Sequence, residues 1–159
     1  MTATLDIQQP SALAAASRRR YVTARSLSEI AELEAQWDAC PSAAANPMSS
    51  FSWLQSATAS LAQRQRVQVV ALFDGDRLRA AAPLIQGPAG RWELLNHYKL
   101  YEPADLLFAD ETSLEQLADE LARRGLPLFL GRVPAVSPTF AAIERAYGRR
   151  GLMARRPQA

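Results

Sequence analysis

The sequence predicts an α/β (α+β) domain in which a mixed, largely antiparallel sheet is flanked by helices. Three observations lead to this prediction. Apolar segments with strand periodicity alternate with segments of helical periodicity, the turn Asp74-Gly75-Asp76 joins two of the strand-like segments, and capping-box patterns mark two helix starts. The 159 residues, 48% hydrophobic and 21% charged, have the composition of one globular domain.

The first expected elements are a strand and two helices. Residues 21–24 are rich in aromatic and β-branched side chains, which favours a strand. Ser26-Leu-Ser-Glu29 is a capping box, and apolar residues then follow one face of a helix as far as Trp37. A second helix is predicted over 51–61, with Ser49 or Ser50 as its cap.

A meander of three strands should follow. Residues 67–73 and 77–85 form the two strands of a hairpin around Gly75. Residues 92–95 supply the third strand, and 105–108 are a candidate to continue it after an insertion.

The last expected elements are a helix, a strand and a helix. Thr112-Ser-Leu-Glu115 reads as a second capping box, and its helix should end at Gly125. A strand is predicted over 126–133, and Ser137-Pro138 has the pattern of the N-cap and first residue of a final helix. We therefore expect a flexible leader over 1–19, a folded domain over 20–151, and a tail or the start of a missing strand over 152–159.

Composition excludes several classes of site. A single cysteine, Cys40, cannot form an internal disulfide, and with a single histidine it cannot build a usual zinc cage, so we expect no metal. The formal net charge is only +2, and arginines concentrate near the expected ends of the fold, so no nucleic-acid partner is indicated. No apolar run is long enough for a membrane span, and we expect a cytoplasmic protein.

The turn over 109–113 does not suit a phosphate. A strand-to-helix turn that binds a pyrophosphate needs glycines, and its helix start should be free of acids. This turn has no glycine, and it carries Asp110 and Glu111. We expect the chain's own carboxylates to occupy the position that a ligand phosphate would take.

Several short motifs resemble the N-terminal half of a FemAB-like tandem GNAT acetyltransferase, including members associated with cellulose biosynthesis. These are Trp37-Asp38, the helix start from Asn46 to Leu54, the hairpin that leads to Pro83-Leu84, and Asp105-Leu-Leu107. The order of elements also resembles the GNAT fold, whose sheet is normally completed by two further strands, so the sheet is expected to be incomplete at its C-terminal end. The resemblance covers about residues 21–151.

The resemblance implies an acyl-CoA-dependent acetyltransferase with two halves, of which the second usually holds acetyl-CoA and the first helps to form the acceptor cleft. In members that bind the cofactor, the meander is followed by a motif of Gln or Arg, any two residues, Gly, any one residue, and Gly or Ala. Residues 109–113 do not match this motif. Acetyl-CoA is therefore expected in a complete protein but not on this chain alone, and the residues that bind it are unknown.

The candidate catalytic residues lie in the polar segment 96–102. His97 has the chemistry of a general base near neutral pH, and Tyr98 or Tyr101 that of a proton donor. Glu102 or Asp105 has the chemistry to orient a cationic or hydroxylated acceptor. The alternative is an irregular loop whose rings pack on the sheet and whose charges face water.

Phe51 and Trp53 are candidate substrate-binding residues, because aromatic side chains at a helix start can line a cleft. The alternative is that they anchor this helix on the sheet.

Two functions remain open. The first is the acceptor-side half of an acyl-CoA-dependent N- or O-acetyltransferase acting on a sugar, a polysaccharide precursor or an amine. The second is a non-catalytic module that binds a partner protein or a small molecule. The expected partners are a C-terminal GNAT-like half or a second copy, because an open sheet edge favours association.

Overall fold

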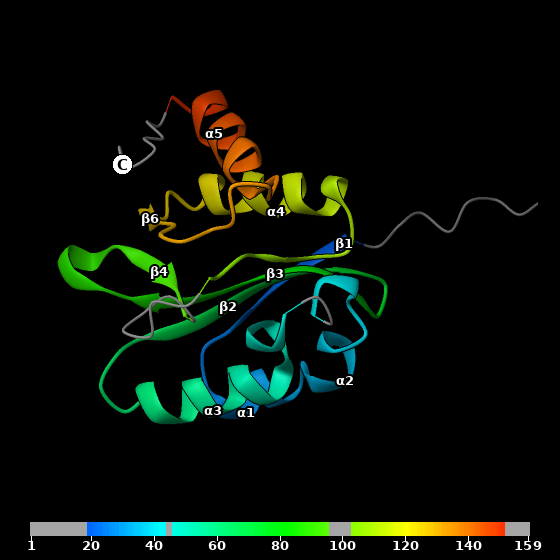
Figure 1. Ribbon diagram of the computed structural model, residues 1–159, viewed down its shortest axis with the longest axis vertical. Helices are drawn as coiled ribbons and strands as arrows, with labels where there is room; N and C mark the ends of the chain where they lie inside the picture. The colour runs from blue at the N-terminus through cyan, green and yellow to red at the C-terminus, as the bar shows by residue number, and fades with distance from the viewer. Residues whose placement is uncertain (1–18, 44–45, 96–102, 152–159) are drawn as a thin grey trace, which may run out of the picture.

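A sheet of six strands separates two groups of helices in the computed structural model, which describes residues 19–43, 46–95 and 103–151 (Figure 1). The helices on one face are α1 (Leu27–Ala31), α2 (Glu34–Trp37) and α3 (Phe51–Leu61). Those on the other face are α4 (Glu111–Arg123) and α5 (Thr139–Arg149). Three short 3-10 turns, η1 (Pro41–Ala43), η2 (Pro47–Ser49) and η3 (Pro88–Gly90), lie in the connections.

The sheet is mixed and mostly antiparallel, which confirms the predicted fold class at this level. Its strands are β1 (Arg19–Ala24), β2 (Val67–Asp74), β3 (Arg77–Gln86), β4 (Trp92–Leu94), β5 (Leu107–Phe108) and β6 (Leu128–Phe129). Their order is β1-β2-β3-β4-β6, and β5 pairs with β3. Only the β4–β6 pair is parallel among these strands; the others are antiparallel.

Strands β4 and β5 are two pieces of one interrupted strand. β4 pairs with the end of β3, where Leu94 faces Leu84, and β5 pairs with the middle of β3, where Leu107 faces Ala81. The opposite edge of β3 is taken by β2. The prediction that residues 105–108 continue the third strand after an insertion is therefore confirmed, with regular pairing at Leu107 and Phe108.

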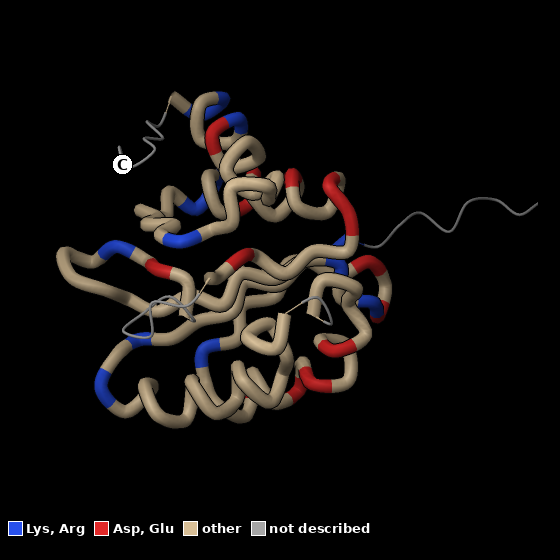
Figure 2. Tube along the Cα trace, in the orientation of Figure 1, with Lys and Arg blue, Asp and Glu red and all other residues tan. Residues whose placement is uncertain are grey.

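Each face of the sheet carries its own apolar core, because successive residues of a strand point to opposite faces. Along β2, Val69 and Ala71 pack against α1–α3, whereas Val70 and Leu72 pack against α4 and α5. All four side chains are fully buried. The charged positions lie mainly in the helices and turns, with acidic and basic residues interspersed (Figure 2).

Two predicted helix starts are confirmed. Ser26 and Glu29 form the capping box, in which Glu29 N donates to the Ser26 hydroxyl and Ser26 N donates to the Glu29 carboxylate. Ser50 caps α3 by accepting from Trp53 N. The helix predicted as far as Trp37 is divided into α1 and α2, because Leu33 N donates three residues back to Ile30 O and tightens the turn between them.

Two other helix starts differ from the prediction. Asp110, not Thr112, is the N-cap of α4, because the helix already begins at Glu111. Helix α5 has Pro138 at the N-cap position and begins at Thr139, although the Ser137 hydroxyl accepts from Thr139 N. Helix α4 therefore begins two positions before the predicted residue, and α5 begins one position after it.

The predicted strand over 126–133 is also shorter than expected, since only Leu128 and Phe129 pair in β6. Pro127 precedes them and has no N–H for a ladder. Arg132 adopts a left-handed conformation with φ of 58°, which ends the extended run. Apolar composition alone therefore overestimated this strand.

Candidate functional site

The interruption between β4 and β5 opens the sheet beside Pro83. Leu95 N donates to Pro83 O at 3.0 Å, and the chain then leaves the edge of β3. It rejoins that edge at Leu107. Two residues later, Ala109 N donates to Arg79 O at 2.8 Å. The interruption of this edge therefore lies between Leu95 and Leu107.

The departure of the neighbouring strand explains why a proline is tolerated at position 83. The N–H and C=O of a strand residue point to the same edge, and the carbonyl of Pro83 points toward β4. The proline nitrogen therefore faces the edge from which the neighbouring strand departs. A proline inside a central strand normally removes a ladder hydrogen bond. Leu95 lies opposite Pro83 at the end of the β4 pairing, so the missing N–H removes only one bond at the end of this ladder.

A small cleft adjoins the opening, between α3 and the sheet. Its volume is about 10 Å3, which is room for about one water molecule. A larger ligand would therefore lie at the mouth of the cleft. The lining residues are Trp37, Met48, Ser49, Ser50, Trp53, Leu54, Pro83, Asp105 and Leu107.

Trp37 and Asp38 hold the helix start that forms one wall of the cleft. The Trp37 indole Nε1 donates to Ser49 O at 2.7 Å, and Phe51 N donates to the Asp38 carboxylate at 2.9 Å. The rings of Trp37 and Phe51 also meet edge to face, with centroids 6.4 Å apart. The Trp-Asp pair of the sequence therefore has a structural role: it fixes the position of α3 and hence of Trp53.

Asp105 forms the opposite side of the cleft and is held by two donors. Its Oδ1 accepts from Leu106 N at 2.8 Å and from the Thr139 hydroxyl at 2.5 Å. Thr139 is fully buried at the start of α5. Hydrogen bonds to a carboxylate are stronger than neutral ones, so they fix the orientation of this group.

The structure brings two of the predicted site residues together. Trp53 and Asp105 line the same cleft, although they are 52 positions apart in the chain. Phe51 instead lies in the core with 1% of its surface exposed, as the packing alternative expects. The candidates His97, Tyr98, Tyr101 and Glu102 fall outside the described residues.

Two residues of the site, Pro83 and Thr139, were not predicted as site residues from the sequence. Pro83 had a usable signal, since a proline within an apolar strand-like segment marks an edge or an interruption. Thr139 had none, because its contact with Asp105 joins residues 34 positions apart.

The start of α4 is occupied by the chain's own carboxylate, as the acidic turn predicted. The Asp110 Oδ1 accepts from Ser113 N at 2.8 Å and from the Ser113 hydroxyl at 2.7 Å, while its Oδ2 pairs with Arg79. Hydrogen bonds from Ser113, reinforced by the charge of Arg79, lower the pKa of Asp110. A pyrophosphate at this helix start would meet a carboxylate, so these residues do not fit that part of acetyl-CoA.

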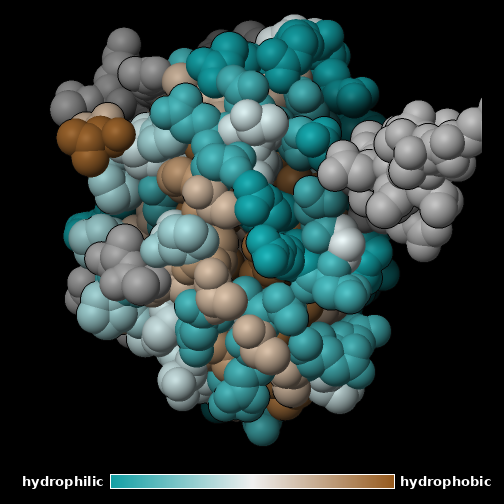
Figure 3. Space-filling view, turned by 90° about the vertical axis from the view of Figure 1, so that its right-hand side faces the viewer, coloured by the Kyte–Doolittle hydropathy of each residue, from teal (hydrophilic) through white to brown (hydrophobic). Residues whose placement is uncertain are grey.

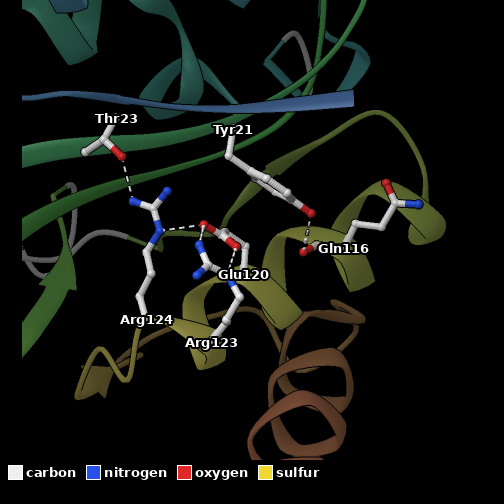
Figure 4. A network of polar contacts seen from close by, with 6 residues as sticks. All are labelled: Tyr21, Thr23, Gln116, Glu120, Arg123 and Arg124. Carbon is white, nitrogen blue, oxygen red and sulfur yellow. Dashed lines mark hydrogen bonds and ion pairs between the residues drawn. The ribbon is translucent and has the colours of Figure 1, made fainter. Parts of the chain in front are cut away.

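A polar network joins the other end of α4 to β1 (Figure 4). Glu120 is 4% exposed and accepts from Arg123 and Arg124, and hydrogen bonds from these arginines lower its pKa. Arg124 continues to the Thr23 hydroxyl at 2.6 Å, and the Tyr21 hydroxyl donates to Gln116 O at 3.1 Å. This network anchors α4 under the edge strand, and its donors and acceptors are paired with one another.

Other reactive groups give no further site. Cys40 is 2% exposed, and burial raises the pKa of its thiol. Such a thiol is a poor nucleophile. Among residues 19–43, 46–95 and 103–151, no three His, Cys, Asp or Glu side chains are grouped to hold a metal. In the same ranges, no helix is long and apolar enough to cross a membrane.

No family model, curated protein or solved structure matches this chain. The likeness to the FemAB-like group therefore stays a prediction from short motifs. The function is therefore inferred from the geometry of the cleft and of the sheet edges.

Proposed function

We propose that this domain is the acceptor-side half of an acyl-CoA-dependent N- or O-acetyltransferase that acts on a sugar, a polysaccharide precursor or an amine. The observation that carries the proposal is the meeting of Trp53 and Asp105 at the interruption of the sheet. The order of strands supports it, because an antiparallel meander followed by a helix and a parallel strand is compatible with a GNAT-like sheet.

The two side chains supply complementary recognition. The Asp105 carboxylate attracts an ammonium group or accepts from a hydroxyl group, and Trp53 offers an aromatic face to the apolar side of a sugar ring or an alkyl chain. Because the cleft itself admits only a water-sized group, the acceptor lies at its mouth. His97 is the proposed general base, Tyr98 or Tyr101 the proton donor, and Glu102 a second acceptor-binding carboxylate.

The acyl donor would be bound by a second half. Asp110 fills the start of α4, so this helix is closed to a cofactor phosphate. Acetyl-CoA should therefore bind only to a complete protein that brings another GNAT-like domain.

Calorimetric titration of the chain with D-glucosamine tests acceptor binding, because this sugar carries both an ammonium group and hydroxyls. Wild type should bind it, and Asp105→Asn should bind about tenfold more weakly because the substitution removes the charged partner. Asp119→Asn is the matched control, since Asp119 is an exposed carboxylate of α4 that pairs with Arg149 of α5 and does not line the cleft. Equal binding by wild type and Asp105→Asn would contradict the proposal.

A non-catalytic partner-binding module is the second candidate. The observation that favours it is the pair of sheet edges in the described residues, formed by β1 at one side and by the two-residue strand β6 at the other. This function predicts self-association or partner capture with no response to D-glucosamine.

A further inference from the structure

The outer side of β1 presents backbone groups that no strand of the described residues covers. β1 is the terminal strand of the sheet and pairs only with β2. An edge strand of this kind is a template for another strand. Whether another strand can pair with β1 depends on which of its residues direct their backbone N–H and C=O groups outward.

The hydrogen bonds of the central strands identify those residues. The carbonyls of Arg79 and Pro83 point toward β5 and β4, so the alternate residues of β3, such as Leu84, point toward β2. Leu84 faces Gln68, and alternation along β2 then turns Val69 and Ala71 toward β1.

The same alternation carries over to β1. Val69 and Ala71 face Ala24 and Val22. Residues 20, 22 and 24 therefore bond to β2, and the backbones of Arg19, Tyr21 and Thr23 point outward.

A groove of about 500 Å3 runs beside this edge. One end holds Arg20, whose guanidinium lies over the Phe73 ring, and also Asp76. Acidic residues of the first helical segment, Glu29 and Glu32, line the same groove. The side view of the molecule shows a mostly hydrophilic surface with less polar residues in a band through its middle (Figure 3).

We propose that a second copy of this chain pairs antiparallel with β1, about a two-fold axis that passes beside Tyr21. In this register Tyr21 faces its own counterpart, and Arg19 faces Thr23 of the partner copy, so the outward backbone groups of both strands are paired. Arg20 lies opposite Val22 of the partner copy, on the face of the acidic groove. The contact is the same in both directions, as a two-fold interface requires.

Charge selects this register over its neighbour. An axis at Val22 would place Arg19 opposite Arg25 of the partner copy, and like charges directly opposite are destabilising. With the axis at Tyr21, Arg20 of each copy instead approaches the groove that Glu29 and Glu32 line. Tyr21, which is 39% exposed in the single chain, becomes covered. This proposal depends on the edge strand alone and does not require the acceptor function.

Sedimentation velocity of the full chain, from micromolar to millimolar concentration, tests the proposal. Wild type should dimerise with rising concentration, and Tyr21→Pro should stay monomeric because it removes an outward N–H without removing one that bonds to β2. Tyr21→Phe keeps the backbone and should dimerise. A monomer at every concentration, or a Tyr21→Pro variant that dimerises like wild type, would overturn the proposal.

If Tyr21→Pro does not fold, an exchange of charge between Arg20 and Glu32 tests the same interface. Arg20→Glu should weaken dimerisation by about tenfold, because the lost attraction occurs twice in a symmetric interface, and adding Glu32→Arg should restore most of it. Arg64→Glu, an exposed site outside the groove, should have no effect. Equal weakening by Arg20→Glu and Arg64→Glu would contradict the proposed register. Circular dichroism establishes that each variant is folded.

Discussion

The hydroxyl of Thr139 donates to the carboxylate of Asp105 at 2.5 Å, and this contact links α5 to the candidate cleft. Thr139 begins a helix on one face of the sheet, whereas Trp53, across the cleft from Asp105, belongs to a helix on the other face. The two helical layers therefore meet at Asp105, where the sheet is interrupted.

Replacing Thr139 by Val should lower the free energy of unfolding by about 1–2 kcal/mol, because a buried donor to a charged acceptor is lost without a change of shape. D-glucosamine binding should also weaken, since Asp105 loses one of the two donors that fix it. Urea unfolding and calorimetry measure the two effects. Thr139→Ser keeps the hydroxyl and should bind D-glucosamine like wild type; equal binding by Thr139→Val would show that the hydroxyl does not position Asp105.

Two proline substitutions test the direction of the β3 backbone. Ala82→Pro should lower the free energy of unfolding by about 3 kcal/mol or more, because residue 82 bonds toward Val70 of β2. Pro83→Ala should cost less than about 1 kcal/mol, the effect of a more flexible unfolded chain. Thermal unfolding with circular dichroism compares them. Similar losses in both variants would contradict the interruption as described.

Removing the cap of α4 should destabilise the domain in a pH-dependent way. Asp110→Ala should cost about 1 kcal/mol near neutral pH, and Asp110→Asn only a few tenths because it can still cap. The pKa of Asp110 is lower in the folded chain than in the unfolded one, so its ionic contribution is complete above the unfolded value of about 4 and disappears as pH falls through the folded value. The difference in the free energy of unfolding between wild type and Asp110→Ala, measured with urea, should therefore narrow from neutral to acid pH. A difference that is constant with pH would contradict the role of the charge.

Loss of the buried Glu120 carboxylate near the end of α4 should lower the free energy of unfolding more than loss of an exposed carboxylate. Glu120→Gln should cost about 1–2 kcal/mol, because Glu120 is 4% exposed and accepts from both Arg123 and Arg124. Glu115→Gln breaks an exposed ion pair with Arg145 and should cost less than about 0.5 kcal/mol. Chemical denaturation measures both. Equal costs would indicate that solvent screens the Glu120 network as well.

Local patterns in the sequence predicted most of the fold. The Ser26–Glu29 capping box and the turn at Gly75 depend on residues within four positions of one another, so they can be read directly from the chain. The strand over 126–133 was overestimated because its apolar composition does not reveal the left-handed Arg132. The cap of α4 was placed at Thr112 because that pattern also fits a capping box, whereas Asp110 gains a second partner in Arg79, which is distant in the chain.

The candidate site was only partly predictable. Trp53 and Asp105 were selected for their chemistry, and their position on one cleft follows from the pairing of β5 with β3. The contact between Asp105 and Thr139 could not be predicted, because no periodicity relates a loop carboxylate to a helix start far along the chain.

Two-dimensional NMR of the isotopically labelled chain, titrated separately with D-glucosamine and acetyl-CoA, tests the central claim most directly. Our account predicts that D-glucosamine shifts the Trp53 indole and the Leu107 amide, which line the cleft, and that acetyl-CoA leaves the Ser113 amide unchanged because Asp110 already occupies it. Shifts of Ser113 with acetyl-CoA, or no shift of Trp53 and Leu107 with D-glucosamine, would contradict the assignment of this domain to the acceptor side.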